Sequence, residues 1–327
     1  MQANRRNVLG GLAAMGAAGF ALPALAQNIR VDNTAALNGV SQAVVGAFTV
    51  AFLTSRNDRA HAGGGLLGSA SGGRSSARTA LEGVSDADFR HATDRLYEDF
   101  VAQLQTAGFQ LGDRAALLEA VRRMNGTPFD SGGQYEVILG RNSNADSRVF
   151  SPSALDGVWV PREAMNLINL PRFQAGRSGV GFAMAAQTYA RQTQTAVVNA
   201  VYVIDFAQAD ALGGYFAHRS SVQVQAGLAL TPEASRVFAY APNGRVATAM
   251  VREPIAVGGD FGVFADATSG GMRATEAAVN ALTLLTSGYS NSTRRYVMTA
   301  DAPRWAEGVD ELGRVANGRL IGALRGR

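Results

Sequence analysis

Three glycines of this 327-residue chain, Gly63, Gly65 and Gly68, follow an apolar strand pattern with the spacing G-x-G-x-x-G. In a dinucleotide-binding fold this spacing aims backbone amides at a pyrophosphate, and a helix must begin at the last glycine. Residues 69–76 contain only Ser, Ala, Gly and Arg, have poor helix propensity and lead into a second strand pattern. We therefore interpret residues 61–76 as a mobile hairpin loop, and we predict no cofactor there.

The three histidines do not form a recognisable metal or general-base site. His61 lies in the glycine-rich loop, His91 on a predicted helix and His218 in a predicted loop. Neither H-x-x-x-H nor H-E-x-x-H spacing occurs among them. Because His91 falls off the apolar stripe of its helix, we expect its side chain to be exposed.

An Asx-rich stretch resembles the start of a calcium-binding loop. Asn142, Asn144 and Asp146 have the spacing of the first ligands of such a loop. The glycine required at the sixth position is missing, however, and Ser153 stands where the bidentate glutamate belongs. We interpret the stretch as a surface turn.

The residue types of the chain exclude several hydrolase classes. There is no Cys and no G-x-S-x-G motif, and all 30 basic residues are Arg. Disulfides, thiolate metal ligands, cysteine nucleophiles and lysine Schiff bases are therefore excluded. Four acidic residues are expected on the exposed side of a helix, where solvation explains their charge: Asp86, Asp88, Asp94 and Asp99. The sequence thus predicts no catalytic, cofactor-binding or metal-binding residue.

The net charge gives no broad field that would attract nucleic acid. The whole chain carries +4, and loss of Arg5 and Arg6 would leave 28 basic against 26 acidic residues. The Arg residues are scattered, which is typical of a solvated surface.

The first 26 residues have the order of a cleavable export signal. Arg5 and Arg6 form a positively charged start, and a Gly- and Ala-rich run over 8–22 is too short and too weakly apolar for a stable transmembrane helix. Ala24 and Ala26 then provide the small-x-small pattern of a cleavage site, so we predict cleavage after Ala26. The paired arginines favour the twin-arginine route. The general secretory route stays open, because the usual aromatic and later Lys of the twin-arginine consensus are missing.

Residues 43–53 are apolar on both sides of an extended strand, which is typical of a central, covered strand. The alternation places Val44 with Phe48 on one face and Val45 with Ala47 on the other. A second strand is predicted to end at Val84.

The clearest helix is predicted over 86–107. Ser85 and Asp88 have the spacing of a capping box, and an apolar stripe follows at intervals of three and four residues: Phe89, Thr93, Leu96, Phe100, Leu104 and Ala107. Beyond this helix we expect a short strand at 109–111 and a helix that Asp113 caps.

The second half of the chain mixes strands and helices. Residues 127–181 are rich in Gly, Asn, Ser and Pro and are expected to form irregular surface, and GVFADATSGG at 262–271 interrupts the strand pattern. The predicted elements, in chain order, are a helix at 182–193, strands at 196–206 and 221–230, a hairpin of 235–241 with 246–253, a helix at 275–285, a strand at 295–299 and a helix at 303–324. Together these elements predict an α/β (α+β) fold, with helices packed on a mixed sheet and a single domain over 27–327.

This succession of elements resembles the periplasmic domain of the curli secretion lipoprotein family, the CsgG-like proteins. Three segments carry the resemblance: VVGAFTVAFL followed by a helix and Gly108-Phe109-Gln110-Leu111-Gly112-Asp113-Arg114, then VVNAVYVIDF, then SSVQVQAGLALTPEASRVFAYAPNGRV. The resemblance implies an envelope protein that acts in secretion or assembly. That family is lipidated at a Cys that this chain lacks, and its membrane-spanning hairpins are matched here only by the lengths of 196–206 and 221–230.

Two functional hypotheses follow. The first is a non-enzymatic envelope protein, periplasmic or outer-membrane associated, that binds itself or another envelope protein along sheet edges such as 221–230 and through glycine-rich loops. The second is a periplasmic enzyme or cofactor-binding protein that the twin-arginine route exports in folded form.

Overall fold

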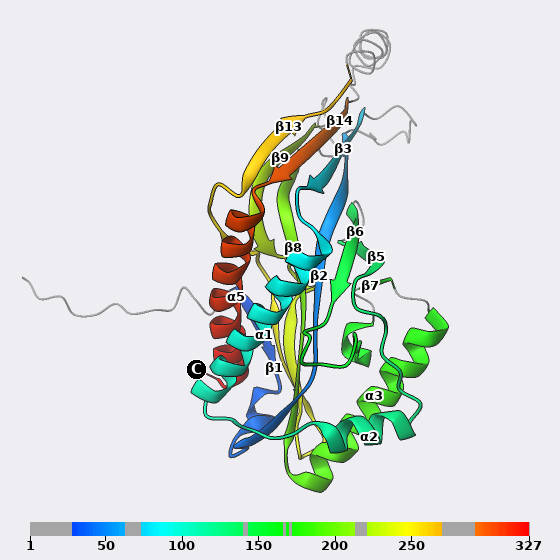
Figure 1. Ribbon diagram of the computed structural model, residues 1–327, viewed down its shortest axis with the longest axis vertical. Helices are drawn as coiled ribbons and strands as arrows, with labels where there is room; N and C mark the ends of the chain where they lie inside the picture. The colour runs from blue at the N-terminus through cyan, green and yellow to red at the C-terminus, as the bar shows by residue number, and fades with distance from the viewer. Residues whose placement is uncertain are drawn as a thin grey trace, which may run out of the picture.

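The computed structural model describes residues 28–62, 73–139, 143–165, 168–169, 172–212, 221–269 and 292–326. It confirms the predicted α/β class, because helices pack against one large mixed sheet (Figure 1). The longest path through the sheet runs in the order β1-β11-β10-β8-β2-β3-β14-β13. The signal residues Arg5, Arg6, Ala24 and Ala26 lie outside the described residues.

Strand β2 (Gln42–Ala62) is the centre of the sheet, as the apolar run over 43–53 predicts. Between Ala43 and Phe52 it pairs in parallel with β8 (Ala196–Leu212) and is buried on both faces. A two-residue strand, β4 (Gln110–Leu111), pairs with the start of β2 in the predicted position.

A bulge at Gly46 changes which side chains of β2 share a face. Val44 and Ala47 pack in one apolar cluster, whereas Val45 and Phe48 belong to the larger cluster on the other side of the sheet. The predicted pairing of Val44 with Phe48 is therefore wrong, because one extra residue in a strand reverses the alternation beyond it.

Helices α1 (Asp86–Thr106) and α5 (Ala302–Leu324) lie side by side across one face of the sheet (Figure 1). The Ser85 and Asp88 capping box is present, and the predicted stripe of Phe89, Leu96 and Phe100 is buried. None of the helices in the described part of the chain combines the length and apolar character that crossing a bilayer requires.

Helices α2 (Ala115–Arg123) and α3 (Arg172–Thr193) pack together at the lower end (Figure 1). Asp113 accepts a hydrogen bond from the amide of Ala115 at 3.0 Å, but Arg114 is the residue that precedes the first turn of α2. Helix α3 begins at Arg172, well before the predicted start at 182.

The prediction of irregular surface over 127–181 is wrong. This part forms β5 (Gly133–Ile138), β6 (Ser143–Phe150), the short 3-10 helix η2 (Arg162–Ala164), β7 (Ile168–Asn169) and the first half of α3. Strand β6 pairs with β2 and alternates polar residues with buried ones. Its Asn144 and Asp146 are strand residues and not a surface turn, because they pair with Asn57 and Ser55 of β2. Ser55 donates to Asp146, and Asn144 donates to Glu136. Polar strand residues that bond to each other hide the strand pattern in the sequence.

Strands β10 (Arg236–Tyr240) and β11 (Val246–Val251) form the predicted hairpin, and β1 (Ile29–Asp32) pairs with β11. The 3-10 helix η1 (Thr34–Leu37) connects β1 to β2.

The sheet forks at its upper end (Figure 1). From Ser55 onward β2 pairs with β3 (Gly73–Glu82), while β8 continues in a hairpin with β9 (Ser221–Leu230). Strand β14 (Ser292–Ala300) adds in parallel to β3, β13 (Gly262–Asp266) adds to β14, and β12 (Ile255–Val257) adds to β9. The predicted loop at 61–76 is therefore too long, since residues 61–62 and 73–76 are paired strand residues. Residues 262–266, which were predicted to interrupt the strand pattern, also form a strand. Residues 63–72 and the predicted helix at 275–285 lie outside the described residues.

An ion cluster lies at the fork. Arg56 of β2 donates to Asp58 with its Nε at 2.8 Å from Oδ2, and its Nη1 contacts Asp205 of β8. Ser143 also donates to Asp58, at 2.6 Å. Burial by itself lowers the pKa of Arg56, but the carboxylates of Asp205 and Asp58 outweigh it and raise that pKa above its ordinary value. The cluster thus joins the two hairpins by charge at the point where they separate.

Candidate functional site

Among the described residues, the structure does not gather histidines or Asx residues into a site, and Asn142 lies outside the described part. His91 is exposed on α1, as predicted, whereas the side chain of His61 and all of His218 lie outside the described residues. Among the residues with described positions, no group of three His, Cys, Asp or Glu side chains is arranged to hold a metal ion.

The sequence predicts that the acidic residues of α1 are simply solvated. The structure instead gives each of them a hydrogen-bond or ion-pair partner. Asp88 closes the capping box, Asp86 pairs with Arg148, and Asp94 accepts hydrogen bonds from Ser153. Asp99 accepts a hydrogen bond from Asn317. Each of these carboxylates therefore ties α1 to itself or to a neighbouring element.

The contact of Asp99 belongs to a buried polar network between β8, α1 and α5. The Tyr202 hydroxyl donates to Asn317 Oδ1 at 2.6 Å, and Asn317 Nδ2 donates to Asp99 at 2.8 Å and to the Leu96 carbonyl at 3.2 Å. Burial, with a smaller contribution from Asp99, raises the pKa of Tyr202 well above its ordinary value. Tyr202 is therefore held as a neutral donor that positions α5, not as a base.

We expect Asn317→Leu to lower the free energy of unfolding by about 1–3 kcal/mol, because the Tyr202 hydroxyl and Asp99 then lose a buried partner. Denaturant unfolding of Asn317→Leu, Tyr202→Phe and the double variant measures the coupling. The double variant should cost less than the sum of the two single variants by about 0.5–3 kcal/mol. Strictly additive costs would show that the network does not act as a unit.

A shallow groove lies above this network, between α1 and α5. It has a volume of about 430 Å³, and its lining includes Asp99, Gly313 and Arg314, together with Arg95 and Asp310, which form an ion pair at 2.7 Å. Gly313 is required there, because a Cβ atom at its position would stand 2.0 Å from the Leu96 side chain.

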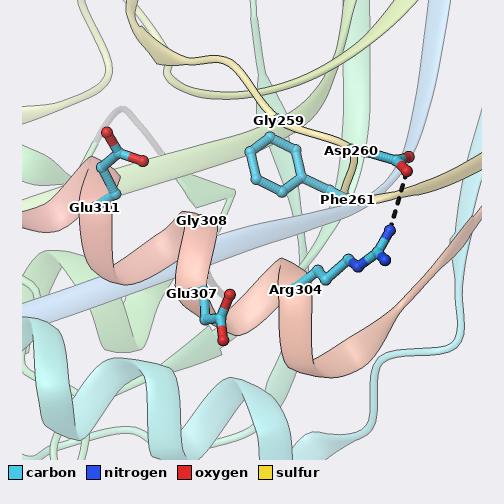
Figure 2. Close-up of a pocket in the computed structure, with 7 residues that line it drawn as sticks. All are labelled: Gly259, Asp260, Phe261, Arg304, Glu307, Gly308 and Glu311. Atoms are coloured by element: carbon cyan, nitrogen blue, oxygen red, sulfur yellow. Dashed lines mark hydrogen bonds and ion pairs between the residues drawn. The ribbon is translucent and has the colours of Figure 1, made fainter.

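A second hollow, of about 340 Å³, lies where the loop before β13 meets α5 (Figure 2). Arg304 pairs with Asp260 at 3.0 Å on one side, and Glu307 and Glu311 project from successive turns of α5 (Figure 2). The Phe261 ring packs against Gly308, where an added Cβ would lie 2.2 Å from the ring.

The lining of this hollow is acidic. Glu307 and Glu311 form no ion pair with any residue in the described ranges, so the hollow has two uncompensated negative charges. Its lining contains no hydroxyl, thiol or imidazole that could act as a nucleophile or general base with these carboxylates. A Lys or Arg side chain of a partner would complement it.

Strand β13, which follows the hollow directly, is the last strand in the described order of the sheet. It pairs with β14 on one side, and no described strand pairs with its other side. The Phe261 carbonyl and the Ala267 amide bond toward β14, so the odd-numbered residues face β14. The backbone groups of Gly262, Phe264 and Asp266 consequently point away from the sheet. Val263 is 70% exposed.

The sequence analysis predicted neither the β13 edge nor the acidic hollow, although the sequence contains signals for both. GVFAD is a five-residue strand pattern without Pro, and Glu307 and Glu311 are four residues apart on the predicted terminal helix. Their adjacency could not be predicted, because it depends on the turn that brings Asp260 beside Arg304.

Comparisons of the chain with protein-family models, with curated proteins and with solved structures find no match. The resemblance to CsgG-like proteins therefore stays a prediction, and the functional argument depends on the geometry of the site.

Proposed function

We propose that this chain is a non-enzymatic protein of the bacterial envelope, which acts in assembly or secretion by binding an extended segment of another envelope protein along β13. The backbone groups of Gly262 and Phe264, which point away from β14, carry the proposal, because an extended segment can pair with such an edge by strand addition. The export signal predicted over residues 1–26 supports the location. The acidic hollow at the start of β13 favours a partner segment with a basic side chain.

Strand β13 suits this role better than the other edges of the sheet. Strand β1 carries Arg30 and Asp32, charges of the kind that protect an edge from unwanted pairing, and β7 is only two residues long. Strand β9, part of the edge expected from the sequence, is paired with β8 along its length and with β12 over 228–230. In β13 the one charged residue is Asp266.

The proposal is tested by photo-crosslinking in the native host. A crosslinking residue at position 265, which is exposed on β13, should yield a discrete adduct, and Val263→Lys should abolish most of it, because a charge on an edge strand opposes pairing. The matched control is Val31→Lys on β1, where Val31 is 49% exposed, and this change should leave the adduct intact.

The mass of the adduct identifies the occupant. An adduct of twice the mass of the chain indicates self-association, whereas any other mass indicates a different envelope protein. If position 265 gives no adduct, or if Val31→Lys removes the adduct as efficiently as Val263→Lys does, β13 is not the binding edge.

A further inference from the structure

Three arginines form a row on one face of the upper sheet. Arg295 of β14 lies directly opposite Arg78 of β3, and Arg78 lies opposite Asn57 of β2. Arg59, two residues beyond Asn57, has its side chain on the same face. All three arginines are exposed, and neighbouring strands are only about 4.8 Å apart.

These three guanidinium groups have no acidic partner in the described part of the chain. No ion pair joins Arg59, Arg78 or Arg295 to a described carboxylate, although the exposed Arg95 and Arg304 do form such pairs. The residues paired with the row, Asn57 and Ser76, are neutral. Like charges directly opposite each other destabilise a sheet, so an anion that neutralises them would bind favourably.

Apolar side chains continue the same face toward the sheet edge. Val297 lies two residues beyond Arg295 and is flanked by Ala80 on β3 and by Ala265 on β13. Val263, two residues before Ala265, is on this face and is 70% exposed. Figure 1 shows β13, β14 and β3 side by side at the upper end. The face thus carries arginines on β2, β3 and β14 and apolar side chains toward β13, and its one acidic residue on β3 is Glu82, which lies opposite Thr299.

We propose that this face docks on the surface of an anionic bilayer, with the arginines on lipid phosphates and Val263 in the interfacial region. Arginine–phosphate contacts explain the charge, and the adjoining apolar strip favours a lipid surface over a soluble polyanion, which would leave Val263 in water. The inference is independent of strand addition at β13, which uses the backbone edge and not the face.

The test is cosedimentation of the full-length chain with vesicles of phosphatidylcholine, with or without phosphatidylglycerol. We expect binding only when phosphatidylglycerol is present, and weaker binding as salt is raised. The double variant Arg78→Gln, Arg295→Gln should bind about 30-fold more weakly. The control pair Arg245→Gln, Arg252→Gln removes the same charge from exposed positions elsewhere on the molecule and should bind like the parent chain. All variants retain residues 1–26, so any contribution of that segment is equal.

Two further variants distinguish lipid phosphate from a soluble polyanion, and bilayer docking from strand addition at β13. Val263→Ser should weaken vesicle binding without changing the binding of dextran sulfate, and Val263→Lys should strengthen vesicle binding while it abolishes the crosslink from position 265. Equal loss of vesicle binding in both double variants would overturn the proposal. So would tight binding of dextran sulfate with no binding of the vesicles.

Discussion

Replacing Phe100 by Ala is expected to lower the free energy of unfolding by about 3–5 kcal/mol, a large part of the total stability of an ordinary domain. Phe100 is fully buried, and its ring centroid lies 5.1 Å from that of Phe48 on β2. Truncation leaves a cavity between α1 and the centre of the sheet, where close packing prevents complete collapse. Denaturant unfolding with a circular dichroism readout measures the change.

Gln105→Ala is the matched control, because Gln105 is exposed on the same helix. It should change stability by no more than about 0.5 kcal/mol. An unfolding curve for Phe100→Ala that coincides with this control would contradict the packing of α1 on β2.

Removing the guanidinium of Arg56, which lies where the sheet forks, should lower the stability of the fold by a similar amount. We expect Arg56→Met to lower the free energy of unfolding by about 3–5 kcal/mol at neutral pH, because Asp58 and Asp205 then lose the guanidinium that compensates their burial. Equilibrium unfolding at a series of pH values measures this loss.

The pH dependence provides a specific signature of the charge. Without Arg56, the folded variant holds two buried carboxylates that have lost the Arg56 guanidinium, so it takes up protons more readily than the unfolded chain and gains stability as the pH falls. The gap between the variant and the parent chain should therefore narrow toward about pH 4. The apolar replacement Arg56→Met, Asp58→Leu, Asp205→Leu should recover much of the loss. A cost that is the same at every pH, or a triple variant less stable than Arg56→Met, would show that packing and not charge explains the effect.

The prediction of the ordered elements succeeded where one face of an element is consistently apolar. The stripe from Phe89 to Leu104 and the Ser85 capping box predicted α1 with its correct start, and the double-sided apolar run predicted the central part of β2. The terminal helix was predicted one residue from its observed start at Ala302. In each case neighbouring residues contain the whole signal, because helix and strand periodicity are local properties.

The prediction failed where a strand is stabilised by polar pairs or changes its partner. In β6, Asp146 accepts a hydrogen bond from Ser55 and Asn144 donates one to Glu136, and these partners are far away in the sequence or on another strand. The polar residues of β6 therefore give its sequence the composition of a turn. The bulge at Gly46 reverses the faces of β2. An isolated glycine inside a strand is a local signal for a bulge, and the prediction did not use it.

The sequence by itself determined the α/β class, helices α1 and α5, and the absence of Cys and Lys chemistry. The export signal stays a prediction. The tertiary structure alone decided which charges are paired. It places Arg56 between two buried carboxylates, leaves Arg59, Arg78 and Arg295 without a described partner, and puts no described strand on the outer side of β13. These properties depend on strand order and register, which arise from pairing between residues far apart in the chain, such as Arg78 and Arg295.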